Sequence, residues 1–198
     1  MLASTLQAAG GALSEVDCFA VSAGPGSFTG LRIGIGAVKG MAYGLDKPCI
    51  PVSTLDALAR NLSGVEGIIC AAMDARCSQV YTALFESTPS SLSRRMPDSA
   101  LTLDELWEEL KNVKKNIFLV GDGAQLCYNK FSPLLPNLYL AGEGVRYQRA
   151  ASVILAAKEA WDAGKAVSAA RLAPVYLRLP QAERERNRNK QLEGTNAI

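Results

Sequence analysis

The 198-residue sequence predicts an α/β protein of two lobes, and three observations support this. Short runs that are apolar on both faces, typical of buried parallel strands, alternate with segments of helical periodicity. The order α-β-α-β-α occurs twice along the chain. Only the second occurrence follows a run of strands, so an internal duplication with the leading hairpin missing from the first lobe is the simplest interpretation. We expect an N-terminal lobe over 1–63, a C-terminal lobe over 64–179 and a polar tail over 180–198.

The first lobe is expected to alternate helices with buried strands. In order, these are a helix over 1–9, a strand over 16–22, a glycine-rich turn over 24–30, a helix ending at 45, a strand over 49–52 and a helix ending at 62. Gly10-Gly11 is a typical helix end, and Ser53 or Thr54 can cap the last helix.

The second lobe is expected to begin with a strand meander. Strands over 67–73 and 80–85 form a hairpin, and an edge strand lies within 86–99. Thr102 and Glu105 form a capping box that opens a helix ending near residue 113. A strand over 116–120, a helix over 124–131, a strand over 138–140 and a helix over 148–163 complete the lobe. On the last helix, an apolar face toward the core is expected from Ala150, Ile154, Ala157 and Trp161.

The composition excludes several classes of protein. Hydrophobic residues make up 48% and charged residues 20%, which is ordinary for a globular protein. The chain contains no histidine, so it has no Ser-His or Cys-His pair, no HExxH zinc site and no imidazole base. A net charge of +2 gives no overall basic field that would attract nucleic acid unaided.

The cysteines and the apolar segments indicate a cytoplasmic protein. The five cysteines are odd in number and contain no CxxC, so neither a disulfide framework nor a zinc knuckle is expected. The sequence has no basic segment followed by an apolar one, the pattern of a secretory signal peptide, so secretion is not expected. The apolar stretch 28–45 carries Arg32 and Lys39, which cost about 2.5–3.5 kcal/mol each at a bilayer centre, so we do not interpret it as a membrane span.

Three turns could form a degenerate nucleotide or phosphate site. Backbone N–H groups between a strand and a helix N-terminus can hold an anion, but the 24–30 turn matches neither the Walker A pattern nor the dinucleotide fingerprint. Two acidic turns, around Asp74 and Asp122, could orient a nucleotide, although aspartate and glycine are also ordinary turn residues. The candidate residues are Gly24, Gly26, Ser27, Thr29, Asp74, Arg76, Gly121, Asp122 and Gly123.

A glycine stripe runs along the helix over 27–45. Gly36, Gly40 and Gly44 recur every four residues, with Ala37 and Met41 beside them. Interior glycines cost about 1 kcal/mol each relative to alanine, so a compensating interaction is expected. Such a stripe lets another helix approach closely. That helix could belong to a partner or to the same lobe, and the sequence leaves both open.

Five blocks, in this order and spacing, closely resemble the bacterial TsaB family, also called YeaZ. They are Gly24-Pro25-Gly26-Ser27-Phe28-Thr29-Gly30-Leu31-Arg32-Ile33-Gly34, Pro51-Val52-Ser53-Thr54-Leu55, Asp74-Ala75-Arg76 with Val80-Tyr81, Gly121-Asp122-Gly123-Ala124 and Pro174-Val175-Tyr176-Leu177-Arg178. The resemblance extends from Leu2 to about Arg184. It implies the actin/Hsp70/sugar-kinase-like ATPase fold, which is ribonuclease H-like, with two duplicated lobes.

The resemblance also implies a function. It implies the dimerisation subunit of the machinery that installs N6-threonylcarbamoyl on adenosine 37 of ANN-decoding tRNAs. The expected partners are the catalytic subunit TsaD and the ATPase TsaE, with tRNA reached through the complex and a homodimer formed when TsaD is absent.

The resemblance implies an interface but no catalytic role. The interface with TsaD would contain Leu2, Leu6, Ile33, Gly36, Ala37, Gly40, Met41 and Gly44. No catalytic residue, metal or cofactor is expected, and peptidase chemistry is implausible without histidine ligands. The alternative function is that of an ATP-binding phosphotransferase or ATPase of the same fold. For acidic phosphate-site residues, that alternative has only Asp74 and Asp122.

Overall fold

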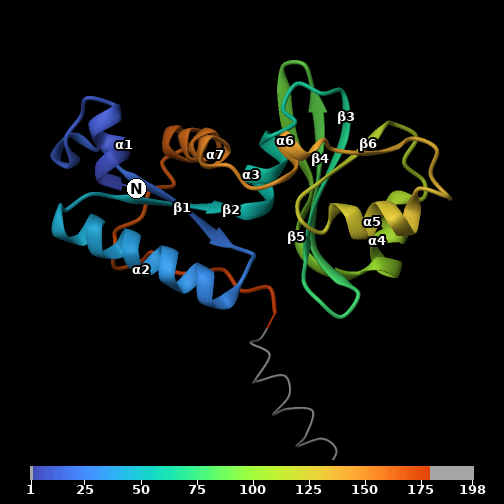
Figure 1. Ribbon diagram of the computed structural model, residues 1–198, viewed down its shortest axis with the longest axis horizontal. Helices are drawn as coiled ribbons and strands as arrows, with labels where there is room; N and C mark the ends of the chain where they lie inside the picture. The colour runs from blue at the N-terminus through green and yellow to red at the C-terminus, as the bar shows by residue number, and fades with distance from the viewer. Residues whose placement is uncertain (1, 179–198) are drawn as a thin grey trace, which may run out of the picture.

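The computed structural model describes residues 2–178, without the side chains of Leu2 and Ala3. The expected polar tail over 180–198 lies outside the described residues. Figure 1 shows two groups of elements: a two-stranded sheet with α1, α2 and α7 around it, and a five-stranded sheet with α4 and α5 beside it. Helix α3 (Thr54–Arg60) lies between them.

The two-stranded sheet joins β1 (Phe19–Gly24) and β2 (Cys49–Ser53) in parallel. Helix α2 (Phe28–Gly44) connects the strands and packs on one face, while α7 (Ala150–Asp162) packs on the other. Before β1 lie α1 (Leu2–Ala8) and a 3-10 turn, η1 (Leu13–Glu15). β1 begins three residues later than expected because the N–H of Val16 is still bonded to the carbonyl of Leu13.

The five-stranded sheet has the order β5-β4-β3-β6-β7. Its strands are β3 (Gly67–Asp74), β4 (Gln79–Thr88), β5 (Ser91–Thr102), β6 (Ile117–Val120) and β7 (Leu138–Leu140). The expected hairpin, the edge strand and the two later strands are all confirmed, and β6 pairs in parallel with both β3 and β7. Because side chains alternate along β3, its even-numbered residues Ile68, Cys70 and Ala72 face a different helix layer from Ile69 and Ala71.

Each face of this sheet has its own apolar core. Helices α4 (Leu103–Leu110) and α5 (Ala124–Phe131) cover one face, with Leu106 and Phe131 fully buried. The capping box of Thr102 and Glu105 is confirmed, although α4 ends at Leu110 rather than near residue 113. Helix α3 covers the other face through Leu55 and Leu58. A short helix, α6 (Glu143–Arg146), was not expected.

Helix α7 packs with a different face from the one expected. Ala157 is buried as expected, but Ala150 is exposed, Ile154 is 63% exposed and Trp161 is 41% exposed. The buried residues are instead Ser152, Ala156 and Ala157, with Val153 and Ala160 partly buried beside them. Small residues let α7 lie close to β2 and α3, and this close approach leaves the bulkier side chains outside. The division at residues 63 and 179 remains a prediction, but α7 packs against elements of the first group.

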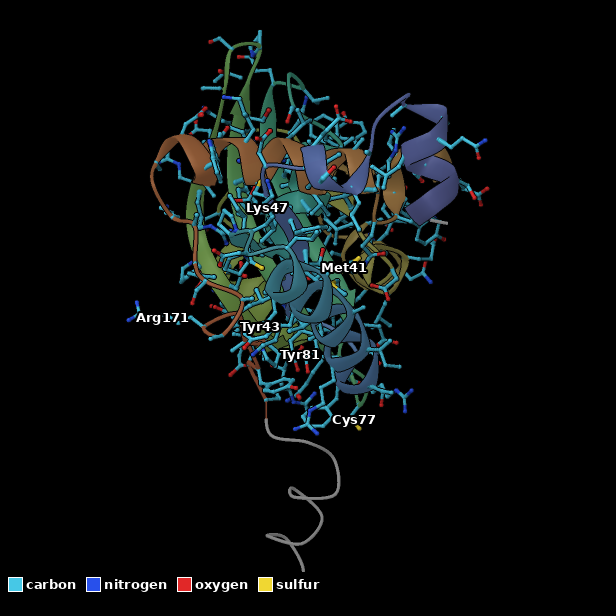
Figure 2. All side chains as sticks on the ribbon, turned by 90° about the vertical axis from the view of Figure 1, so that its left-hand side faces the viewer. Met41, Tyr43, Lys47, Cys77, Tyr81 and Arg171 are labelled. Atoms are coloured by element: carbon cyan, nitrogen blue, oxygen red, sulfur yellow. The ribbon has the colours of Figure 1, made fainter. Side chains whose placement is uncertain are left out.

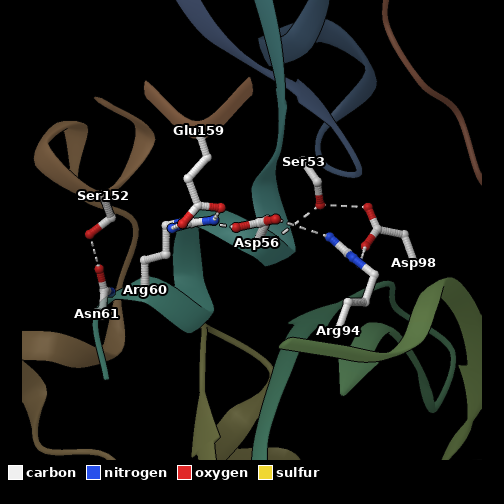
Figure 3. A network of polar contacts seen from close by, with 8 residues as sticks. All are labelled: Ser53, Asp56, Arg60, Asn61, Arg94, Asp98, Ser152 and Glu159. Carbon is white, nitrogen blue, oxygen red and sulfur yellow. Dashed lines mark hydrogen bonds and ion pairs between the residues drawn. The ribbon is translucent and has the colours of Figure 1, made fainter. Parts of the chain in front are cut away.

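A polar network joins the two groups of elements at α3 (Figure 3). The Arg60 guanidinium donates to both Glu159 carboxylate oxygens, at 2.8 and 2.7 Å, and its Nε donates to Asp56 at 2.7 Å. Arg94 on β5 reaches Asp56 and Asp98. Charged groups from α7, α3 and β5 are thus fixed relative to one another. Over residues 2–178, no helix is long and apolar enough to cross a membrane.

Candidate binding cleft and the outer face of helix α2

A cleft of about 570 Å³ lies between the two groups of elements. Its walls come from the turn before α2, from the end of β3 and from the segment 175–178, with Tyr81 and Asp122 between them. Six of the nine expected site residues line it: Gly26, Ser27, Thr29, Asp74, Arg76 and Asp122. The other three, Gly24, Gly121 and Gly123, stand behind these walls.

Those three glycines serve close backbone contacts. At Gly24, a Cβ would lie 2.2 Å from the Val175 carbonyl oxygen, and at Gly121 2.0 Å from that of Ala72. Both have positive φ, of +135° and +112°, which side-chain-bearing residues rarely adopt. A Cβ at Gly123 would likewise lie too close to backbone, 2.8 Å from the carbonyl carbon of Met73. For these glycines, the ordinary-turn interpretation suffices.

The start of α2 is fixed to the C-terminal segment by an aromatic stack. Ser27 caps the helix by accepting the N–H of Gly30 at 3.3 Å. The Phe28 ring stacks on Tyr176 with centroids 4.7 Å apart, and the Arg32 guanidinium lies 4.0 Å above Phe28. Arg32 Nε also donates to the Tyr176 hydroxyl at 3.1 Å. Phe28 and Tyr176 therefore line the cleft as a preformed aromatic pair that Arg32 contacts.

The charged residues of the cleft lie in tight turns. Asp122 accepts the backbone N–H of Asp74 at 3.3 Å, and Asp74 accepts that of Arg76 at 2.7 Å. Burial raises the pKa of Asp122, while the hydrogen bond from Asp74 opposes the rise. Arg178 donates to the Ala75 carbonyl at 2.8 Å. Arg76 is exposed on a left-handed turn and has no side-chain partner among the described residues.

The cleft contains two carboxylates, Asp74 and Asp122. Each carboxylate already accepts a backbone N–H, and in residues 2–178 no cluster of three or more His, Cys, Asp or Glu could hold a metal. The cleft offers aromatic surface, guanidinium groups and carboxylate acceptors. Sequence reasoning missed Phe28, Tyr81, Tyr176 and Arg178 as cleft residues. The only signal for the last two was their place in the Pro174–Arg178 block.

The glycine stripe of α2 faces outward. A Cβ at Gly36, Gly40 or Gly44 would meet nothing within 4 Å. Beside the stripe, Ile33 is 68% and Tyr43 81% exposed. The opposite side of α2 packs inward through Leu31, Ile35 and Ala42. No described element of this chain packs against the stripe, so the described residues give no support to the interpretation of packing inside the lobe.

The other expected interface residues differ in exposure. Ala37 is exposed, while Leu6 and Met41 are half-buried. The side chain of Leu2 lies outside the described residues. Met41 and Tyr43 both lie in the last turn of α2, at the end of the helix nearest the viewer in Figure 2.

Comparisons with known proteins identify the family of this chain. The family model described as "TsaD: tRNA N6-adenosine threonylcarbamoyltransferase" matches residues 1–185. The tRNA threonylcarbamoyladenosine biosynthesis protein TsaB of Bacillus subtilis is 33% identical over 164 residues, 82% of this chain and 70% of that protein. The chain belongs to the TsaB family. TsaB of Escherichia coli is 31% identical over 181 residues, which cover 90% of this chain and 78% of that protein.

Solved structures agree with the family. YeaZ from Pseudomonas aeruginosa matches with a TM-score of 0.72 and 31% identity, covering 88% of this chain and 81% of that one. The similarity in sequence and fold supports a role in the biosynthesis of threonylcarbamoyladenosine in tRNA, as the relatives' names state. TsaB relatives are therefore the appropriate reference for both the cleft and the outer face of α2.

Proposed function

We propose that the chain is a non-catalytic scaffold subunit of the complex that installs N6-threonylcarbamoyl on adenosine 37 of ANN-decoding tRNAs. In this proposal it docks the transferase TsaD through the outer face of α2. TsaE and tRNA join through the complex, in the cytoplasm. When TsaD is absent, the same face pairs with a second copy of the chain, because an interface between related subunits is nearly self-complementary.

The observation that carries the proposal is the open glycine stripe. Gly36, Gly40 and Gly44 lower the helix stability of α2 by about 1 kcal/mol each, and no described side chain of this chain fills the space above them. A smooth stripe flanked by exposed Ile33 and Tyr43 offers a partner helix close backbone approach and apolar contact. Intermolecular packing is a direct compensation for the cost of these glycines.

The test is Gly40→Leu, measured by calorimetric binding to TsaD and by thermal unfolding of the isolated chain. Overpacking a close helix crossing costs about 1–3 kcal/mol, which corresponds to roughly a tenfold to hundredfold loss of affinity. The melting temperature should stay unchanged or rise, because leucine is a better helix former than glycine.

A matched control is Gly144→Leu, which adds the same side chain to an open helical glycine on α6, far along the chain. It should leave the affinity for TsaD unchanged. If Gly40→Leu binds TsaD as the parent does, or if Gly144→Leu loses as much affinity, the docking assignment to α2 is wrong.

A further inference from the structure

The docking proposal leaves the chemistry of the cleft unused. Two arginines, Arg76 and Arg178, line it, together with the aromatic rings of Phe28, Tyr81 and Tyr176. Arg76 lacks a side-chain partner in the described part of the chain, and Arg178 uses one nitrogen for the Ala75 carbonyl. Tyr176 remains 38% exposed although Phe28 covers one of its faces. Guanidinium groups and rings are therefore present whose binding capacity the fold does not use.

We propose that this cleft holds a nucleotide of single-stranded RNA, with a base against Tyr176 or Tyr81 and its phosphates against Arg76 and Arg178. Stacking on aromatic rings and pairing of arginine with phosphate are the two means by which proteins bind single strands. The volume of about 570 Å³ lies in the usual range for small-ligand clefts, about 300–1,000 Å³, so it is large enough for one nucleotide.

The stack on α2 makes the aromatic wall rigid before any ligand arrives. Phe28 contacts both Arg32 and Tyr176, and the 3.1 Å hydrogen bond from Arg32 to the Tyr176 hydroxyl joins the other two members directly. A base that stacks on Tyr176 continues an ordered column and freezes few additional rotamers. Preorganisation of this kind reduces the entropy cost of binding.

The cleft also holds two carboxylates. Asp74 and Asp122 lie near each other, as the hydrogen bond between Asp74 N–H and Asp122 Oδ1 shows. They repel phosphates, but they can accept hydrogen bonds from the amino groups of a base. A base edge directed toward Asp122 and phosphates directed toward Arg76 satisfy both sets of charges. The inference of RNA over a free triphosphate rests on the proposed tRNA function, and on the absence of a Gly-Lys-Ser/Thr ending in the 24–30 turn.

The experiment measures fluorescence anisotropy of a labelled single-stranded RNA of about ten nucleotides with the full chain. Arg76→Gln should weaken binding and make the slope of log affinity against log salt shallower by about 0.7. Tyr176→Ala should lose roughly fivefold to a hundredfold in affinity, and Tyr176→Phe should retain most of it because the ring remains. Arg171→Gln is the matched control, since Arg171 is an exposed arginine projecting away from Tyr81 and Cys77 (Figure 2).

Three results would overturn the proposal: no RNA binding by the parent chain, equal losses in Arg76→Gln and Arg171→Gln, or displacement of the RNA by an equal concentration of AMP. The last result would assign the cleft to a free nucleotide. TsaD binding is measured on the same variants. If one of these three results is obtained while TsaD binding is intact, only the assignment of RNA to the cleft is wrong. If Gly40→Leu binds TsaD as the parent does, the scaffold proposal is wrong, and the RNA measurement remains valid.

Discussion

The units β1–α2–β2 and β6–α5–β7 have the same order and the same parallel pairing, but different surroundings. Each first strand ends in a Gly-x-Gly turn: Gly24-Pro25-Gly26 in one and Gly121-Asp122-Gly123 in the other. β6 has β3 on one edge and β7 on the other, whereas β1 has only β2. Both units therefore need a glycine-rich turn after the first strand, but only β6 has a neighbouring strand on each edge.

The edges of the two-stranded sheet are unequally protected. On β2, Pro51 has no N–H, and Cys49 is bonded in both directions with Val167. On β1, the parallel register directs the backbone groups of Phe19 and Val21 toward β2 and those of Ala20 and Ser22 toward the open side. β1 is accordingly half-buried from Ala20 to Ser22, while β6 is buried at every position except Phe118. An open edge of this kind invites pairing with another strand.

The largest expected effect is at the turn glycines. Gly24→Ala or Gly121→Ala forces a Cβ against a carbonyl oxygen at positive φ, so each should cost about 2–5 kcal/mol. Gly36→Ala, in open space on α2, should instead stabilise the chain by about 1 kcal/mol. Thermal unfolding should place the two turn variants well below the parent and Gly36→Ala slightly above it. Similar melting temperatures for all three would mean that the turns can relax around a methyl group.

Proline substitutions test the unequal edges. Val21→Pro removes a bond to β2 and should cost about 3 kcal/mol or more, whereas Ser22→Pro alters only the open side and should cost much less. Because every β6 residue from Ile117 to Leu119 pairs with β3 or β7, that strand has no equivalent tolerant position. Urea unfolding measures the difference. Equal costs at the two positions would show that the β1 edge is occupied.

The sequence predicts the local features well because their causes lie within a few residues. The Ser53 cap, the Thr102–Glu105 capping box and the β3–β4 hairpin each depend on neighbours in the chain, and each is confirmed. The prediction of the buried face of α7 was wrong. Apolar periodicity favours the face with Ile154 and Trp161, whereas close packing on β2 buries the face with the small residues. Helical spacing alone does not distinguish these two faces.

The cleft was predicted only in part, for a similar reason. Ser27, Asp74 and Asp122 lie in turns that can be recognised locally. Tyr176 reaches the cleft through contacts with Phe28 and Arg32, which are more than 140 residues away in the sequence. No local pattern indicates such a contact. It depends on the path of the segment from Val167 to Arg178 along β2, α2 and β3.

A smaller effect is expected at the joint between the two regions. Arg60→Ala removes a fork of charged hydrogen bonds from a site where the guanidinium side chain is only 10% exposed, and should cost about 1.5–3 kcal/mol. Lys158→Ala removes an exposed pair with Asp162 on α7 and should cost less than about 1 kcal/mol. Denaturant unfolding compares the two. A cost for Arg60→Ala no greater than that for Lys158→Ala would show that the network of Figure 3 contributes little to joining the regions.

The smallest effect concerns the middle residue of the two Gly-x-Gly turns, which is Pro25 in one and Asp122 in the other. Burial raises the pKa of Asp122 above its ordinary value of 3.8, so the folded chain holds this proton more tightly than the unfolded chain does. The resulting stabilisation is complete below the ordinary pKa and is lost as the pH rises through the raised one. Asp122→Asn keeps an oxygen for the N–H of Asp74 but carries no charge, so it should be slightly more stable than the parent at pH 7. In urea unfolding, this advantage should shrink as the pH is lowered toward 3.8. An advantage that is the same at both pH values would mean that the substitution acts through packing and not through the proton.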